Sequence, residues 1–101
     1  MTREFTFNAE KALARLELMS HPARYQVLEM VSGRELDVKT LVAAVGLKQS
    51  ALSQHLKKLR DAGLVETRRD RQTIFYSCRD EAVGKILKTL SSLRSLRRIR
   101  S

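Results

Sequence analysis

The chain has 101 residues, 43% of them hydrophobic, which fits one domain with a modest core. No part of the sequence approaches the run of roughly 18 apolar residues that spans a membrane. Its single cysteine, Cys78, excludes an internal disulfide, and two histidines plus one thiol cannot fill an ordinary zinc site. The net charge of +9 lies in residues 48–101, with fourteen basic and five acidic side chains, which favours a polyanion-binding surface over scattered solubilising charge.

The first part of the chain predicts two helices. Asn8 suits the N-cap of a helix over residues 8–19, whose apolar side chains repeat at helical spacing: Ala12, Leu13, Leu16 and Met19. Pro22 suits the first position of a second helix, with Ser20 or His21 as its cap.

A helix-turn-helix is predicted over residues 38–62. Asp37 fits as the N-cap of a helix that Gly46 ends, and a further helix runs from Gln49 to the residue before Gly63. Two short helices with a three-residue joint are typical of this motif.

Residues 64–78 predict a β-hairpin, because two segments rich in Thr, Val, Ile, Phe and Tyr flank a polar turn. The basic turn favours a DNA-contacting wing over a merely solvated turn, with these candidate contacts: Arg68, Arg69, Arg71 and Gln72. Because the turn lacks glycine, we expect Asp70 to adopt the left-handed conformation.

The last predicted helix covers residues 80–98 and carries an apolar stripe at steps of three and four residues: Val83, Ile86, Leu87, Leu90 and Leu93. This stripe either packs within the monomer or joins two copies. We favour a homodimer, because so long an apolar helix is difficult to cover in a small domain.

The helix that starts at Gln49 has small hydrogen-bonding side chains on one flank. At 100° per residue, three leucines fall on the side toward the core and the preceding helix: Leu52, Leu56 and Leu59. An adjacent sector about 140° wide holds the predicted reading face: Gln49, Ser50, Ser53, Gln54 and Lys57. Glutamine and serine offer hydrogen bonds to base edges, and lysine reaches phosphates, so we predict contact with double-stranded DNA. His55 falls on the far flank, where we expect a solvated or backbone-contacting side chain.

These segments resemble a known family. ELDVKTLVAAVGLKQSALSQHLKKLRDAGLVETRRDRQTIFYS, residues 35–77, looks like the winged helix-turn-helix core of ArsR/SmtB-type bacterial transcriptional repressors, and HPARYQVLEMV resembles the helix before it. QSALSQHLKKLR followed by RRDRQTIFYS is particularly similar to the rhizobial nodulation-repressor branch. The resemblance implies a mainly α fold with a small β-hairpin, forming a single domain over residues 1–101.

The resemblance also implies a mode of assembly and binding. A homodimer would form through the first and last helices, with Leu13 and Leu16 at the interface. Its recognition helices would enter successive major grooves of a pseudo-palindromic operator, with half-site centres about 10 base pairs apart or a multiple of that.

The sequence departs from the family at its sensor sites. Where many members have two thiols in an ELCVCDL-like segment, this chain has Asp37 and Lys39, which cannot make a soft-ligand site. The second common site uses Asp and His residues of the last helix, and here Asp80 has no histidine after it. We therefore predict no metal and no cofactor; the effector is unknown. Cys78 leaves a disulfide between subunits as the one redox option.

Lys48 stands at the recognition-helix N-cap, where the family often has serine. A cation is mildly unfavourable there unless a DNA phosphate lies close, so Lys48 is either a DNA contact or a simple surface lysine.

Other functions are less consistent with the residues. The chain lacks the features that an enzyme of a common class would need: paired carboxylates, an activated nucleophile or a glycine-rich phosphate loop. A winged helix that binds a protein partner, RNA, or DNA without sequence preference stays the alternative. The basic tail after Glu81 favours DNA backbone contact over a membrane-surface helix. The opening residues lack the order of a signal peptide, which predicts a cytoplasmic protein that associates with the nucleoid through DNA.

Overall fold

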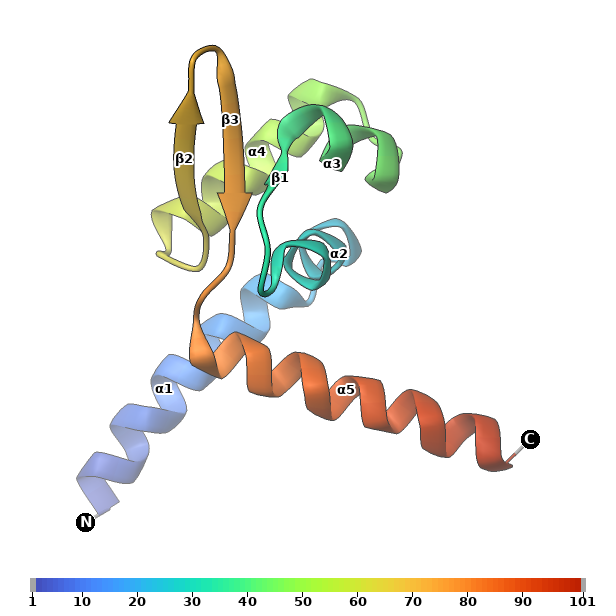
Figure 1. The fold of residues 1–101 in the computed structure, drawn as a ribbon. Helices are drawn as coiled ribbons and strands as arrows, with labels where there is room; N and C mark the ends of the chain where they lie inside the picture. Colours follow the sequence, from blue (N-terminus) through green and yellow to red (C-terminus); the bar gives the residue numbers. More distant parts are fainter. Residues whose placement is uncertain (1, 101) are drawn as a thin grey trace.

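The computed structural model describes residues 2–100, with side chains described from residue 9 to residue 93. Within this range there are five helices and a small three-stranded sheet, with α3 and α4 beside the sheet and α1 and α5 extending away from it (Figure 1). The elements in chain order are α1 (Thr2–Met19), α2 (Pro22–Val31), β1 (Leu36–Asp37), α3 (Val38–Val45), α4 (Gln49–Asp61), β2 (Glu66–Asp70), β3 (Thr73–Ser77) and α5 (Glu81–Arg100). The predicted mainly α fold with a β-hairpin wing is confirmed.

Side chains cap α2 and α3 at their starts. His21 Nδ1 accepts from the Ala23 backbone N–H at 3.1 Å and so caps α2, and Asp37 Oδ1 accepts from the Thr40 N–H at 3.3 Å at the start of α3. Gly46 ends α3 in a left-handed conformation, with its N–H bonded to the Val42 carbonyl at 3.0 Å. These boundaries agree with the predicted ones, because capping residues act locally.

The start of α1 differs from the prediction. The helix begins at Thr2 rather than at Asn8, whose side chain lies outside the described range. Residues 2–7 contain neither glycine nor proline, so nothing in them forces the helix to begin later, and Asn in a helix interior costs only a few tenths of a kcal/mol, about 0.7 at most.

The sheet contains one strand that the sequence did not predict. Its order is β1-β3-β2 and both pairings are antiparallel, with Asp37 of β1 opposite Phe75 of β3. β1 has two residues, too short for any alternation of apolar and polar side chains to be visible. The predicted strand start at Leu64 is also corrected: Leu64 and Val65 are buried core residues before β2.

The turn of the wing is shifted by one residue from the prediction. Asp70 pairs with Thr73 at the end of the ladder, which leaves Arg71 and Gln72 as a two-residue turn. Arg71, with φ of 62°, adopts the left-handed conformation that we expected for Asp70. The strand continues through Asp70 because its backbone still has a partner in β3.

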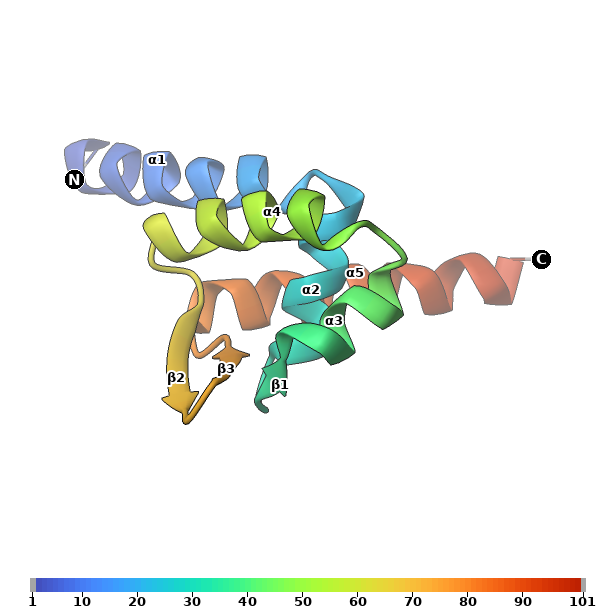
Figure 2. The same cartoon turned by 90° about the horizontal axis from the view of Figure 1, so that it is seen from above.

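The core lies between α2, α4, the sheet and the start of α5. Its largest fully buried side chains come from four helices, α2 to α5: Leu28, Leu41, Leu52, Leu56, Leu59, Val27, Val31 and Val83. Figure 2 shows α4 crossing above α2, and the buried leucines of α4 belong to one core cluster with Val27, Leu28 and Val31 of α2. The hydrophobic side of α4 is therefore fixed mainly by α2.

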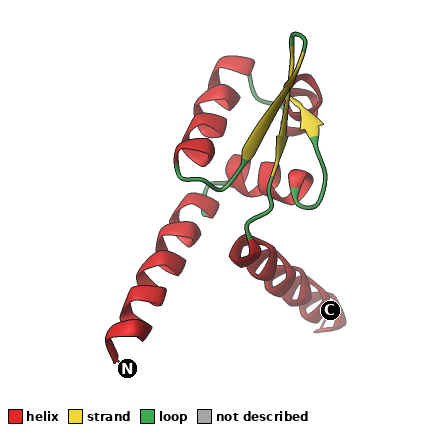
Figure 3. Ribbon diagram, turned by 60° about the vertical axis from the view of Figure 1, so that its left-hand side comes forward, coloured by secondary structure: helices red, strands yellow, loops and turns green. Residues whose placement is uncertain are grey.

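α1 and α5 project from the body on the side away from the wing (Figure 3). The Arg15 guanidinium joins them by donating to both Asp80 carboxylate oxygens, the shortest distance being 2.9 Å. Asp80 also caps α5 by accepting from the Val83 N–H at 2.9 Å. The contact with Arg15 holds the pKa of Asp80 below its usual value.

The apolar stripe of α5 emerges from the core along the helix. Val83 is fully buried and Leu87 is 9% exposed, whereas Leu90 is 38% and Leu93 52% exposed. Val83 and Leu87, predicted as dimer contacts, therefore belong to the core of the single chain. On α1, Leu13 and Leu16 are exposed, and Leu16 lines a groove together with Ile86 and Leu90 of α5.

Candidate nucleic-acid interface

The sequence correctly divides α4 into a buried and an exposed side. The three leucines predicted to face inward are buried: Leu52, Leu56 and Leu59. The predicted reading side is exposed: Lys48, Gln49, Ser50, Ser53, Gln54 and Lys57. Polar groups that are free of the core remain available to a ligand.

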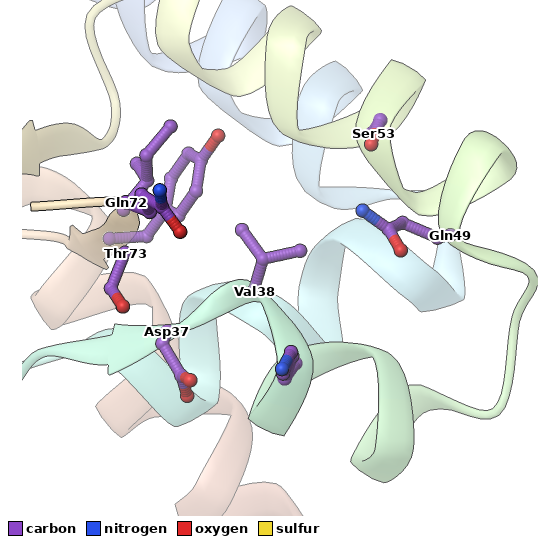
Figure 4. Close-up of a pocket in the computed structure, with 9 residues that line it drawn as sticks. Asp37, Val38, Gln49, Ser53, Gln72 and Thr73 are labelled. Carbon is purple, nitrogen blue, oxygen red and sulfur yellow. The ribbon is translucent and has the colours of Figure 1, made fainter. Parts of the chain in front are cut away.

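A concave surface lies between α4 and the wing and encloses a volume of about 570 Å³. Gln49 and Ser53 line it from α4, and Gln72 lines it from the tip of the hairpin (Figure 4). Asp37 and Lys39, at the start of α3, form its floor. From the sequence we expected nothing of Lys39 beyond the replacement of a thiol, because a lysine in a first helical turn gives no sign of a groove formed with residues far along the chain.

The start of α4 is open. Lys48 occupies the N-cap in an extended conformation and makes no side-chain capping hydrogen bond, unlike the caps of α2, α3 and α5. The first amides of a helix carry partial positive charge and bind anions readily. A phosphate near Lys48 would therefore meet both a cation and these N–H groups.

Lys57 is joined to Asp61 by a surface ion pair of 2.7 Å, with both side chains more than half exposed. Exposed pairs of this kind contribute about 0.2–1 kcal/mol or less, so Lys57 can exchange its carboxylate partner for a phosphate. Its position on the exposed flank agrees with the predicted backbone contact.

The four predicted wing residues do not share one environment. All are exposed, but the register places Arg69 opposite Ile74 and Arg68 opposite Phe75. Directly opposed residues point to the same face of a sheet, and successive residues alternate. Ile74 packs against the core and lines the concave surface, so Arg69 points to that face and Arg68 to the outer one.

His55 differs from the prediction of a solvated residue. Its ring is half-buried, with its centroid 4.3 Å from that of His21, and Arg24 Nη1 donates to His55 Nδ1 at 3.1 Å. Arg24 Nε also donates to the Leu18 carbonyl at 2.6 Å. Burial, followed by the influence of His21 and Arg24, lowers the pKa of His55. Its far-flank angle was right, and the start of α2 covers that flank with His21 and Arg24.

Among the described side chains, residues 9–93, no group of three His, Cys, Asp or Glu residues is placed to hold a metal ion. Asp80 is bonded to Arg15, and the buried Cys78 has a thiol whose pKa is raised by burial. Across the same part of the chain, every helix is too short or too polar to cross a bilayer.

The sequence and the fold both match known regulators. A family model described as bacterial regulatory protein, arsR family, matches residues 21–67. Nodulation protein NolR of Rhizobium meliloti is 50% identical over 86 residues, which cover 85% of this chain and 70% of that protein. Transcriptional activator HlyU of Vibrio cholerae is 41% identical over 91 residues, covering 90% and 84%. The crystal structure of NolR from Sinorhizobium fredii has a TM-score of 0.80 at 46% identity and covers 92% and 93%.

These matches confirm the resemblance to ArsR-type regulators, including the nodulation branch, and they place the chain among DNA-binding regulators rather than enzymes. The chain belongs to the arsR family of bacterial regulatory proteins and is a winged helix-turn-helix transcriptional regulator.

Proposed function

We propose that two copies of the chain bind a pseudo-palindromic DNA operator, each placing α4 in a major groove and its wing beside the phosphate backbone. The concave surface shared by Gln49, Ser53 and Gln72 carries this proposal, because it brings base-reading side chains of α4 and the wing tip to one face. The nucleoid in the bacterial cytoplasm is the proposed site of action.

Roles within this face follow from chemistry and position. Base reading is assigned to the glutamines and serines of the first turns: Gln49, Ser50, Ser53 and Gln54. Backbone contacts are assigned to cations and polar groups around them: Lys39, Lys48, Lys57, Arg69, Arg71 and Gln72. Side chains 94–100, which include most of the basic tail, lie outside the described residues.

The proposed dimer surface comprises Leu13 and Leu16 of α1 with Ile86, Leu90 and Leu93 of α5. Leu16, Ile86 and Leu90 line one apolar groove of about 290 Å³. The stripe of α5 continues past the point where its own chain covers it, which supports a partner for the exposed half. A second copy offers the same apolar surface and thus a symmetric interface.

Repression is the proposed outcome where the operator overlaps a promoter, because a bound dimer then occupies the polymerase's site. HlyU is named an activator, so the winged helix alone does not fix the sign of regulation among these similar proteins.

The proposal is tested by selecting bound duplexes from a random DNA library with purified protein near physiological salt. Enrichment of an inverted repeat supports a dimeric, sequence-specific regulator. Tight, salt-sensitive binding without enrichment would instead indicate a DNA-coating protein without sequence preference.

Alanine substitution of Gln49 or Ser53 is expected to weaken discrimination between the selected operator and a scrambled duplex. Each good base contact contributes about 1–3 kcal/mol to discrimination, whereas binding to scrambled DNA depends on phosphates and should change little. Competition titrations at fixed salt measure the ratio, with Lys58→Ala on the far flank as control. Unchanged ratios in both variants would show that this flank does not read bases.

Arg71→Ala is expected to weaken binding to every duplex and to lower the slope of log K against log salt by about 0.9, the value for one phosphate contact. Arg71→Gly removes the same charge but suits the φ of 62° better than alanine does. If both variants lose the same DNA affinity, the missing charge is the cause. If only the alanine variant loses affinity, the cause is strain in the backbone of the turn. An unchanged slope in both would remove Arg71 from the backbone contacts.

A further inference from the structure

Arg68 is held on the outer face of the sheet by two contacts from different segments. Its guanidinium donates to both carboxylate oxygens of Glu35, with Nη2 2.9 Å from Oε1 and Nε 3.0 Å from Oε2. The same guanidinium lies over the Phe75 ring, 4.7 Å from its centroid. Glu35 directly precedes β1, Phe75 belongs to β3 and Arg68 to β2. We call these three side chains the strap, because together they cross all three strands of the sheet.

The strap faces away from the proposed DNA surface. Arg68 opposes Phe75 on the outer face, whereas its neighbour Arg69 opposes Ile74 on the face of the concave surface. Two consecutive arginines of one strand thus have different surroundings: one is paired within the chain and the other points to the reading side.

The charge of Arg68 is compensated by a carboxylate of its own chain, in a surface pair whose side chains are 53% and 32% exposed. Its bidentate bond is the main reason that the pKa of Glu35 is lowered and that of Arg68 is raised, with Arg79 adding a smaller influence on Glu35. A planar guanidinium that is paired with a carboxylate and covers a ring has two partners to lose before it can reach a phosphate. Arg68 is therefore a poor phosphate ligand while Glu35 is present.

We propose that Glu35 is a specificity-determining residue that acts through Arg68: it retains this arginine on the outer face, so that Arg69 and Arg71 are the wing arginines that meet DNA, in a fixed position relative to α4. The inference rests on the proposed function. It replaces the sequence-based expectation of Arg68 as a DNA contact by a positioning role.

Glu35→Gln keeps the shape of the side chain and removes its charge, which releases Arg68 toward the DNA backbone. We expect the salt slope on scrambled duplex to become steeper by about 0.9, corresponding to one added phosphate contact. The ratio of operator to scrambled affinity should fall about fivefold, the lower end of the cost of one altered base pair. Both quantities come from fluorescence-anisotropy titrations of the full chain at several salt concentrations.

Matched variants distinguish the positioning role from a direct contact. Arg68→Ala is expected to leave the slope unchanged, and Arg69→Ala, one residue away, to lower it by about 0.9. The charge exchange Glu35→Arg with Arg68→Glu restores a paired strap and should return slope and ratio toward wild type. Circular dichroism melts of each variant verify that the domain is folded.

The inference is overturned if Glu35→Gln changes neither slope nor ratio while Arg69→Ala lowers the slope, or if Arg68→Ala lowers the slope as much as Arg69→Ala does. If Arg69→Ala and Arg71→Ala both leave the slope unchanged, the wing is not at the DNA and the proposed function fails first. The two failures are thus separate results of one set of titrations.

Discussion

Leu56→Ala is expected to lower the free energy of unfolding by about 2–5 kcal/mol, because Leu56 is 1% exposed and its loss leaves a cavity between α4 and the rest of the core. Urea denaturation followed by circular dichroism, at one fixed protein concentration, measures the change. A small domain has roughly 5–15 kcal/mol in total, so the variant should also lose operator binding at elevated temperature.

Lys58→Ala, on the exposed side of the same helix, provides the control and should change stability by less than about 0.5 kcal/mol. If Leu56→Ala were as mild as this control, α4 would not be held by its leucine side, and the exposed reading face would lose its structural basis.

Leu16→Asp and Leu93→Asp are each expected to yield a monomer that binds the two-half-site operator about 10²–10⁴-fold more weakly. The leucines are 44% and 52% exposed, so an aspartate costs the single chain little but places a charge in the proposed apolar interface. Binding to a single half-site should hardly change, because the reading face is intact. Analytical ultracentrifugation gives the mass and anisotropy gives both affinities.

Ser92→Asp adds the same charge to an exposed position on the side of α5 opposite the apolar stripe, because Ser92 lies about 160° from Leu90 around the helix at 100° per residue. This control should stay dimeric with unchanged operator affinity. Wild-type mass and affinity in both leucine variants would rule out the proposed interface.

The local features of the chain were predictable from sequence because they depend on neighbours along it. Asp37 caps the helix that follows, Gly46 ends it, and the spacing of Leu52, Leu56 and Leu59 orients α4. The exposed reading flank follows from that orientation without further information.

Features that depend on distant segments were missed or misplaced. Arg68 and Glu35 are 33 positions apart, and His55 and Arg24 are 31 apart, so neither pair leaves a local pattern. Val83 shares its stripe with Leu93, yet one is buried by the body and the other is not. Helical periodicity gives the side of a helix on which residues lie, but tertiary packing determines where along the helix the core ends.

Arg24 has a consequence for the energetics of regulation. One guanidinium is bonded to the end of α1 through the Leu18 carbonyl and to α4 through His55, so displacement of α1 must strain or break a bond that reaches the recognition helix. In the proposed dimer such coupling would be reciprocal: whatever factor subunit association adds to DNA affinity, DNA would add to subunit association. Occupancy of the proposed operator would then depend more steeply than linearly on protein concentration, giving a threshold response from association alone.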